Sequence, residues 1–106
     1  EDQIAYDPAM LIPKGLDAGR ALAALRASRR LLEELPFDEA ALDPALRELA
    51  DRLALKPGQV FGLLRVATTG KNVAPPLFGS FMALGQDRVL ARCREAERLL
   101  ENQMTA

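Results

Sequence analysis

Apolar residues recur every three or four positions along most of this 106-residue chain, and prolines and glycines interrupt the pattern at short intervals. Such spacing places the apolar side chains on one face of a helix, where they can pack against other helices. Residues with β-branched side chains are few, and nowhere do they alternate with polar residues over five or more positions, so we expect no strand. The predicted fold class is all-α, a small multihelical bundle of about five helices.

The interruptions in the apolar pattern predict where each helix begins and ends. Pro36 should end the first helix. Pro44 leaves two possibilities, because it either begins the second helix in its first turn or kinks a longer one, and we place the main helix after it. We expect residues 1–15 to form an irregular linker, residues 16–101 the helical domain, and residues 102–106 a frayed tail. The predicted helices span residues 16–35, 43–53, 59–68, 77–84 and 86–101.

The composition excludes several kinds of chemistry. Histidine is absent and Cys93 is the only cysteine, so nucleophilic sites that need histidine, the usual zinc ligand sets and an internal disulfide are all ruled out. Most of the fifteen acidic residues fall on polar stripes of the expected helices, where carboxylates are usually solvated. We therefore expect no catalytic residue and no metal site, and a reducing, cytoplasmic setting. No apolar run reaches the roughly 18 to 20 residues that span a bilayer, so no membrane partner is expected.

The net charge of −1 conceals an uneven distribution of charge along the chain. Residues 1–51 hold eleven of the fifteen acids, whereas residues 52–94 carry seven lysines or arginines against Asp87 alone, a net charge of +6. A polyanion would be attracted to the second half. On charge alone, an equally good explanation is that folding brings the acidic first half alongside and neutralises it.

The segment 56–87 carries the most specific motif, K-P-G-Q-V-F-G-L-L-R-V-A-T-T-G-K-N-V-A-P-P-L-F-G-S-F-M-A-L-G-Q-D. It resembles the C-terminal anticodon-binding domain of glutamyl-tRNA synthetases, whose pattern is G-x-x-F/M-x-P-L-R-x-A-L/V-T-G, a short loop, S/T-P-x-L-F and then L-G. The resemblance extends back to Tyr6 and Asp7, and so covers nearly the whole chain. Two positions depart from the pattern: Ala74 replaces the usual Ser or Thr, and Leu63 replaces a frequent Pro.

The resemblance implies a role in tRNA recognition within a larger enzyme. The parent would be a glutamate–tRNA ligase that uses ATP and Mg²⁺ in a catalytic half lying N-terminal to this chain, beyond a helical subdomain. Neither of the two signatures of that catalytic half occurs here, so this segment should be non-catalytic and hold no cofactor. The implied partners are the anticodon loop of tRNA(Glu) and the catalytic domain of the same synthetase, and we expect a monomer.

The family's pattern also implies which residues contact the RNA. In the family, the arginine of L-R-x-A and the residues of S/T-P-x-L-F contact the second and third anticodon bases. Phosphate contacts are a further possibility for Lys56, Arg88 and Arg92. The anticodon-binding residues implied for this chain are Arg65, Pro75, Leu77 and Phe78. The resemblance implies contacts by Arg47 and Lys71 less strongly.

The physical properties of these residue types suit unpaired RNA. Bases of a single-stranded loop can be splayed out, stacked on flat side chains and read along their edges. A planar guanidinium such as that of Arg65 can donate two hydrogen bonds and also stack, and a ring such as Phe78 adds about 1 to 3 kcal/mol per stacked base. Prolines such as Pro75 reduce the ordering entropy that is lost on binding.

Each of these residues also has a purely structural explanation. An isolated arginine in an apolar helix, such as Arg65, is more often paired with a carboxylate inside a bundle. Phe81 and Cys93 are expected in the core. Arg88, Arg92 and Arg94 could be solvated. The alternative function is a helical protein–protein interaction domain, with no RNA role, that docks through apolar positions near residues 75–81.

Overall fold

The computed structural model describes residue 12, residues 15–69 and residues 77–105, with only the backbone of 103–105. This part of the chain contains helices and no strand, which confirms the all-α prediction. The helices are α1 (Ala18–Glu34), α2 (Glu39–Arg52), α3 (Pro57–Thr69), α4 (Leu77–Leu84) and α5 (Gln86–Thr105).

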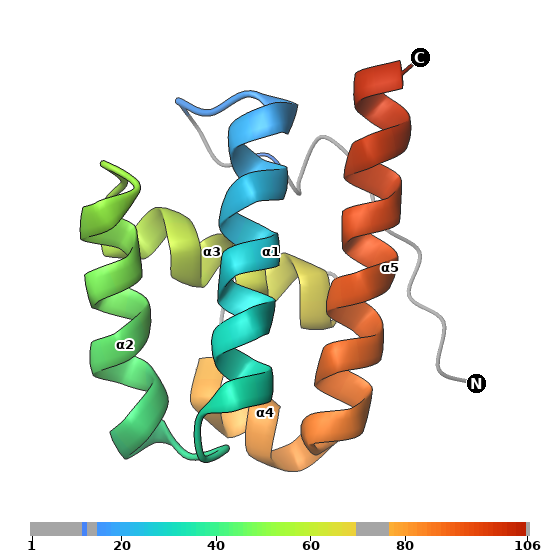
Figure 1. The fold of residues 1–106 in the computed structure, drawn as a ribbon. Coiled ribbons are helices and arrows are strands. Elements are labelled where there is room, and N and C mark those ends of the chain that lie inside the picture. Colours follow the sequence, from blue (N-terminus) through green and yellow to red (C-terminus); the bar gives the residue numbers. More distant parts are fainter. Residues whose placement is uncertain (1–11, 13–14, 70–76, 106) are drawn as a thin grey trace.

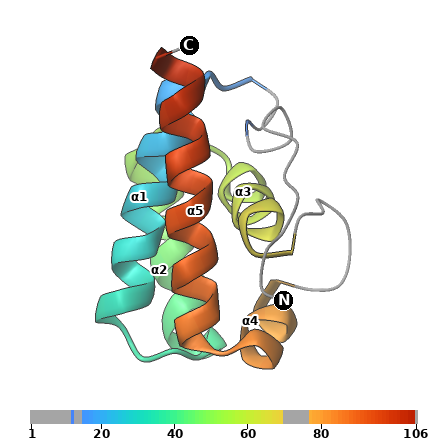
Figure 2. The same ribbon diagram turned by 90° about the vertical axis from the view of Figure 1, so that its right-hand side faces the viewer.

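Three helices form one layer and two shorter helices cover one side of it. Helices α2, α1 and α5 stand side by side, each antiparallel to its neighbour, with α1 in the middle (Figure 1). Helix α3 crosses this layer, and α4 lies near one end, on the same side as α3 (Figure 2). None of the helices in the described ranges has the length and apolar character needed to cross a membrane.

Side-chain caps explain where α1 and α2 begin. The Asp17 carboxylate accepts a hydrogen bond from the backbone N–H of Arg20 at 2.8 Å, and Asp38 accepts one from Ala41 at the same distance. Each bond satisfies one of the N–H groups that the first turn of a helix leaves without a partner.

The predicted start of the second helix is wrong, because α2 begins at Glu39 and continues through Pro44. Leu42, before the proline, is fully buried on the same face as Leu46 and Ala50, whereas Pro44 itself is exposed. The burial of one continuous apolar face therefore offsets the backbone hydrogen bond that the proline cannot make. Helix α5 also exceeds its prediction, because it continues past Glu101 to Thr105.

Gly85 turns the chain sharply between α4 and α5. Its φ of 88° lies in the left-handed region, which a residue with a Cβ atom rarely adopts. Its N–H donates to the Phe81 carbonyl at 2.9 Å, and its carbonyl accepts from Val89 at 3.1 Å, so one residue ends α4 and begins α5. The L-G element of the sequence motif is thus a helix junction.

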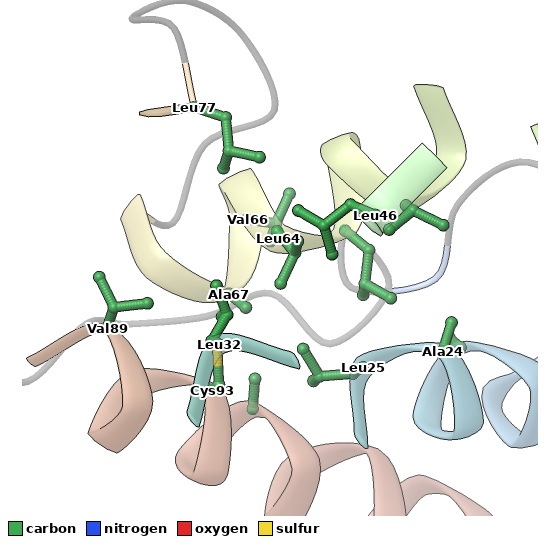
Figure 3. Close-up of a cluster of buried hydrophobic side chains, with 14 of the residues drawn as sticks. Ala24, Leu25, Leu32, Leu46, Leu64, Val66, Ala67, Leu77, Val89 and Cys93 are labelled. Carbon is green, nitrogen blue, oxygen red and sulfur yellow. The ribbon is translucent and has the colours of Figure 1, made fainter. Parts of the chain in front are cut away.

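The hydrophobic core draws on all five helices (Figure 3). Among the described residues Phe81 is the largest fully buried side chain, and its ring stacks on Phe37 with centroids 5.8 Å apart. Cys93 is also fully buried, as predicted, and burial raises the pKa of its thiol to about 12. A thiol that stays protonated is a packing residue rather than a nucleophile.

Ion pairs join α1 to α5 along one edge of the core. Glu97 on α5 is 7% exposed and pairs with Arg29, and its other oxygen lies 3.7 Å from Arg26. Arg94 on α5 pairs with Glu33 on α1 at 2.6 Å. Arg94 is thus neutralised by an acid of the first half, as the charge-balance explanation expects, whereas Glu97, an acid of the second half, neutralises cations of α1.

Candidate nucleic-acid interface

Helix α3 buries most of its surface and leaves one narrow stripe accessible. Phe61, Arg65 and Thr69 follow one another at four-residue spacing, so they lie on one face of the helix, and all three are half-buried. The side chains around the rest of the helix are fully buried: Val60, Leu63, Leu64, Val66, Ala67 and Thr68. The stripe therefore presents an aromatic ring and a guanidinium one turn apart.

Phe78, in the first turn of α4, lies beside this stripe. Its ring meets Phe61 edge to face, with centroids 6.0 Å apart, and it meets Phe81 in the same way at 5.9 Å. Because Phe81 is fully buried, Phe78 is supported from the core while remaining half-buried itself. Two accessible rings from different helices thus form one rigid aromatic surface.

Arg47 of α2 completes this surface. Its guanidinium carbon lies 5.2 Å from the centre of the Phe61 ring, a cation–π contact, and its Nε atom lies 3.1 Å from a carboxylate oxygen of Asp43. The arginine is exposed, so its pairing with Asp43 leaves other guanidinium donors facing solvent. Helices α2, α3 and α4 therefore contribute Arg47, Phe61 and Phe78 to a single patch, which we call the aromatic patch.

Within the described structure, Arg65 is not held by an acid. No carboxylate among the described residues pairs with it, and its Nε atom is buried without a hydrogen-bond acceptor there. The Nε–H is enclosed by the protein and out of reach of a ligand, whereas the terminal nitrogens of the guanidinium are not buried and can donate to a ligand. This arrangement differs from the buried ion pair that an isolated arginine in an apolar helix usually forms.

The other implied contact residues take varied positions. Leu77 is 3% exposed, and its side chain belongs to the hydrophobic core. Lys56 is exposed directly before α3, and Arg88 is exposed in the first turn of α5. Arg92 is half-buried, and its guanidinium donates to the Thr68 carbonyl at 2.7 Å. Pro75 and Lys71 lie outside the described residues.

Phe61 is the functional candidate that the sequence analysis missed. It is not among the contact residues that the family's pattern implies, although four-residue spacing to Arg65 places both on one face of a helix. That spacing was the available signal. Only the fold shows that Phe61 belongs to the patch, because Phe78 and Arg47 from other helices contact its ring.

The patch suits stacking and hydrogen bonding rather than metal chemistry. Its members supply ring faces, ring edges and guanidinium donors. In the part of the chain that the structure describes, no group of three or more carboxylate or cysteine side chains could hold a metal ion.

Comparison with known proteins identifies a family. The model of a family described as anticodon binding domain matches residues 1–97. The glutamate–tRNA ligase of Dehalococcoides mccartyi is 52% identical over 92 residues, which are 86% of this chain and 19% of that protein. The corresponding ligase of Roseiflexus castenholzii is 50% identical over 100 residues, 93% of this chain and 20% of that protein.

A third relative covers the same region. The glutamate–tRNA ligase of Chloroflexus aurantiacus is 45% identical over 98 residues, 92% of this chain and 20% of the ligase. The chain spans about a fifth of the length of these curated relatives. Since the family model covers more than half of the sequence, this chain belongs to the anticodon-binding domain family.

Proposed function

We propose that this chain recognises the anticodon loop of a glutamate-specific tRNA, as the anticodon-binding part of a glutamate–tRNA ligase. The observation that carries the proposal is the position of Arg65, a guanidinium without a carboxylate partner in the described structure, one turn from Phe61 on the accessible face of α3. The ligase names of its relatives support the choice of tRNA.

The chemistry of the whole protein would lie outside this chain. A ligase of this kind attaches glutamate to tRNA with ATP and Mg²⁺, and both would bind in its catalytic domain. This chain would hold no cofactor and would act as a monomeric module in the cytoplasm. Its contribution would be to bind the anticodon loop, and so to position the acceptor end at the catalytic domain.

Recognition would use two kinds of contact. Splayed bases would stack on Phe78 and Phe61, and each stacked base contributes roughly 1 to 3 kcal/mol. The guanidinium groups of Arg65 and Arg47 would donate to base edges or phosphates, for which their planar fork is suited. Because the two rings brace each other across α3 and α4, little ordering entropy would be lost on binding.

The remaining implied residues have distinct parts in this proposal. Lys56 and Arg88 are exposed and would contact phosphates. Leu77 would act through the placement of Phe78, because its own side chain is in the core. Contacts by Pro75 and Lys71 follow from the family resemblance alone.

The proposal is tested by replacing Arg65 with alanine. We expect Arg65→Ala to weaken binding of the tRNA(Glu) anticodon stem-loop by roughly 1 to 3 kcal/mol, measured by fluorescence titration at low salt, with unchanged helical circular dichroism. The matched control is Arg30→Ala, which removes the same charge from the hollow between α1 and α2 and should leave affinity unchanged.

Two outcomes would contradict the proposal. Equal dissociation constants for the unsubstituted chain and Arg65→Ala would show that Arg65 makes no contact with the RNA. Absence of RNA binding by the unsubstituted chain at low salt would instead favour the alternative, a protein-binding helical domain.

A further inference from the structure

The C-terminal turn of α3 ends in carbonyl groups that need donors. A helix leaves its last four carbonyls without backbone partners inside the helix, and these carry partial negative charge. Here the Nη1 atom of Arg92, on α5, donates to the Thr68 carbonyl at 2.7 Å. A cation from a neighbouring helix therefore caps the end of α3 with a charge-assisted hydrogen bond.

The same turn is tied together by two hydroxyl groups. Thr68 donates to the Leu64 carbonyl at 2.7 Å, and Thr69 donates to the Arg65 carbonyl at 2.6 Å. The Thr69 bond ends on the backbone of Arg65 itself. Anything that holds this turn in place therefore also holds the Cα atom from which the Arg65 side chain projects.

Arg92 is well placed to hold α3, because its guanidinium already donates to a carbonyl of that helix. It lies on α5 between the fully buried residues Val89 and Cys93 and is itself half-buried, whereas Arg88, one turn earlier, is exposed. Its guanidinium reaches toward α3, which packs against α5.

We propose that Arg92 is a positioning residue for RNA binding, which fixes the last turn of α3 and with it the Arg65 guanidinium, rather than a phosphate contact. The inference rests on the proposed function. A turn that frays must be reordered when the ligand binds, and that ordering subtracts from affinity. By keeping the turn ordered before RNA arrives, Arg92 strengthens binding without touching the RNA.

Salt dependence separates positioning from phosphate contact. Each phosphate contact on single-stranded RNA contributes about 0.7 to the slope of log affinity against log salt concentration. We expect Arg92→Met to lower affinity for the tRNA(Glu) anticodon stem-loop roughly tenfold while that slope stays the same. Arg92→Lys, whose ammonium can still donate to a carbonyl, should recover part of the loss.

Exchange of backbone amide hydrogens measures, in the absence of RNA, how firmly Arg92 holds the last turn of α3. In Arg92→Met the backbone amides of the last turn of α3, Val66 to Thr69, should exchange faster than in the unsubstituted chain. Arg88→Met is the control, since it removes the same charge from α5 one turn earlier and should leave those rates unchanged. The two variants together separate loss of the cap from loss of a positive charge.

The outcomes are distinguishable. Unchanged exchange in Arg92→Met, or faster exchange with unchanged affinity, would overturn the positioning role. A slope reduced by about 0.7 would make Arg92 a phosphate contact and also overturn it. If the unsubstituted chain binds no RNA, the proposed function fails first, and that result does not depend on residue 92.

Discussion

Phe78 of α4 meets Phe61 of α3 edge to face, with ring centroids 6.0 Å apart and ring planes at 75°. The two residues are seventeen positions apart in the sequence and belong to helices that cover the same side of the three-helix layer (Figure 2). Each ring limits the movement of the other, and the buried Phe81 supports Phe78 from the core. An accessible aromatic surface of this kind keeps its shape before a ligand arrives.

This relationship predicts that substitution of Phe78 affects mainly RNA binding, whereas substitution of Phe81 affects mainly stability. Phe78→Leu should weaken binding of the anticodon stem-loop by about 1 to 3 kcal/mol and change stability little, because a half-buried ring loses stacking rather than core packing. Phe81→Leu should lower the free energy of unfolding by roughly 1 to 2 kcal/mol, because it leaves a cavity in the core.

Urea denaturation and fluorescence titration of both variants measure the two effects. The RNA affinity of Phe81→Leu should be compared under conditions in which the variant is fully folded. If Phe78→Leu bound RNA as well as the unsubstituted chain, the ring would be a packing residue and the aromatic patch would lose its role.

Pro44 is a position at which a substitution should stabilise the protein. It lies inside α2, is exposed, and cannot donate to the carbonyl four residues earlier. Pro44→Ala restores that donor without changing the core, so we expect the free energy of unfolding to rise by roughly 1 to 3 kcal/mol. The measurement is the urea midpoint at constant m-value.

Pro57→Ala is the matched control, because Pro57 is the first residue of α3, where a helix makes no use of the N–H group. That substitution should give no gain. A Pro44→Ala variant no more stable than the unsubstituted chain would mean that the missing bond costs little in this helix.

Substitution of Glu97 should destabilise the protein at the interface between α1 and α5. The carboxylate is almost fully buried and pairs with Arg29, and this hydrogen bond raises the pKa of Arg29. Glu97→Gln should lower the free energy of unfolding by about 1 to 3 kcal/mol, because it leaves the Arg29 cation half-buried without its main partner.

A double-mutant cycle tests the origin of that loss. Combining Glu97→Leu with Arg29→Met removes both charges and should recover part of the stability lost in either single variant. Glu95→Gln is the control, since its carboxylate pairs with Arg98 at the solvent-exposed surface of α5 and should change stability little. Strictly additive effects of the two core substitutions would argue against coupling between Glu97 and Arg29.

Much of the fold follows from local patterns in the sequence. Apolar spacing and the breaks at Pro36 and Gly85 located all five helices, because these signals act over three or four residues. The start of α2 was misplaced because the burial of Leu42, which makes a proline acceptable inside the helix, is a tertiary property. The motif around Arg65 identified the family because residue types and their order are recorded in the sequence itself.

The sequence by itself determined the helical class, the lack of histidine chemistry and the anticodon-binding motif. Only the tertiary structure decided which side chains meet: Phe61 with Phe78 and Arg47, and Arg92 with the end of α3. The physical reason is the distance along the chain over which each kind of interaction acts. Helix formation depends on neighbours within one turn, whereas contacts between helices depend on how whole apolar faces pack together, which no local pattern records.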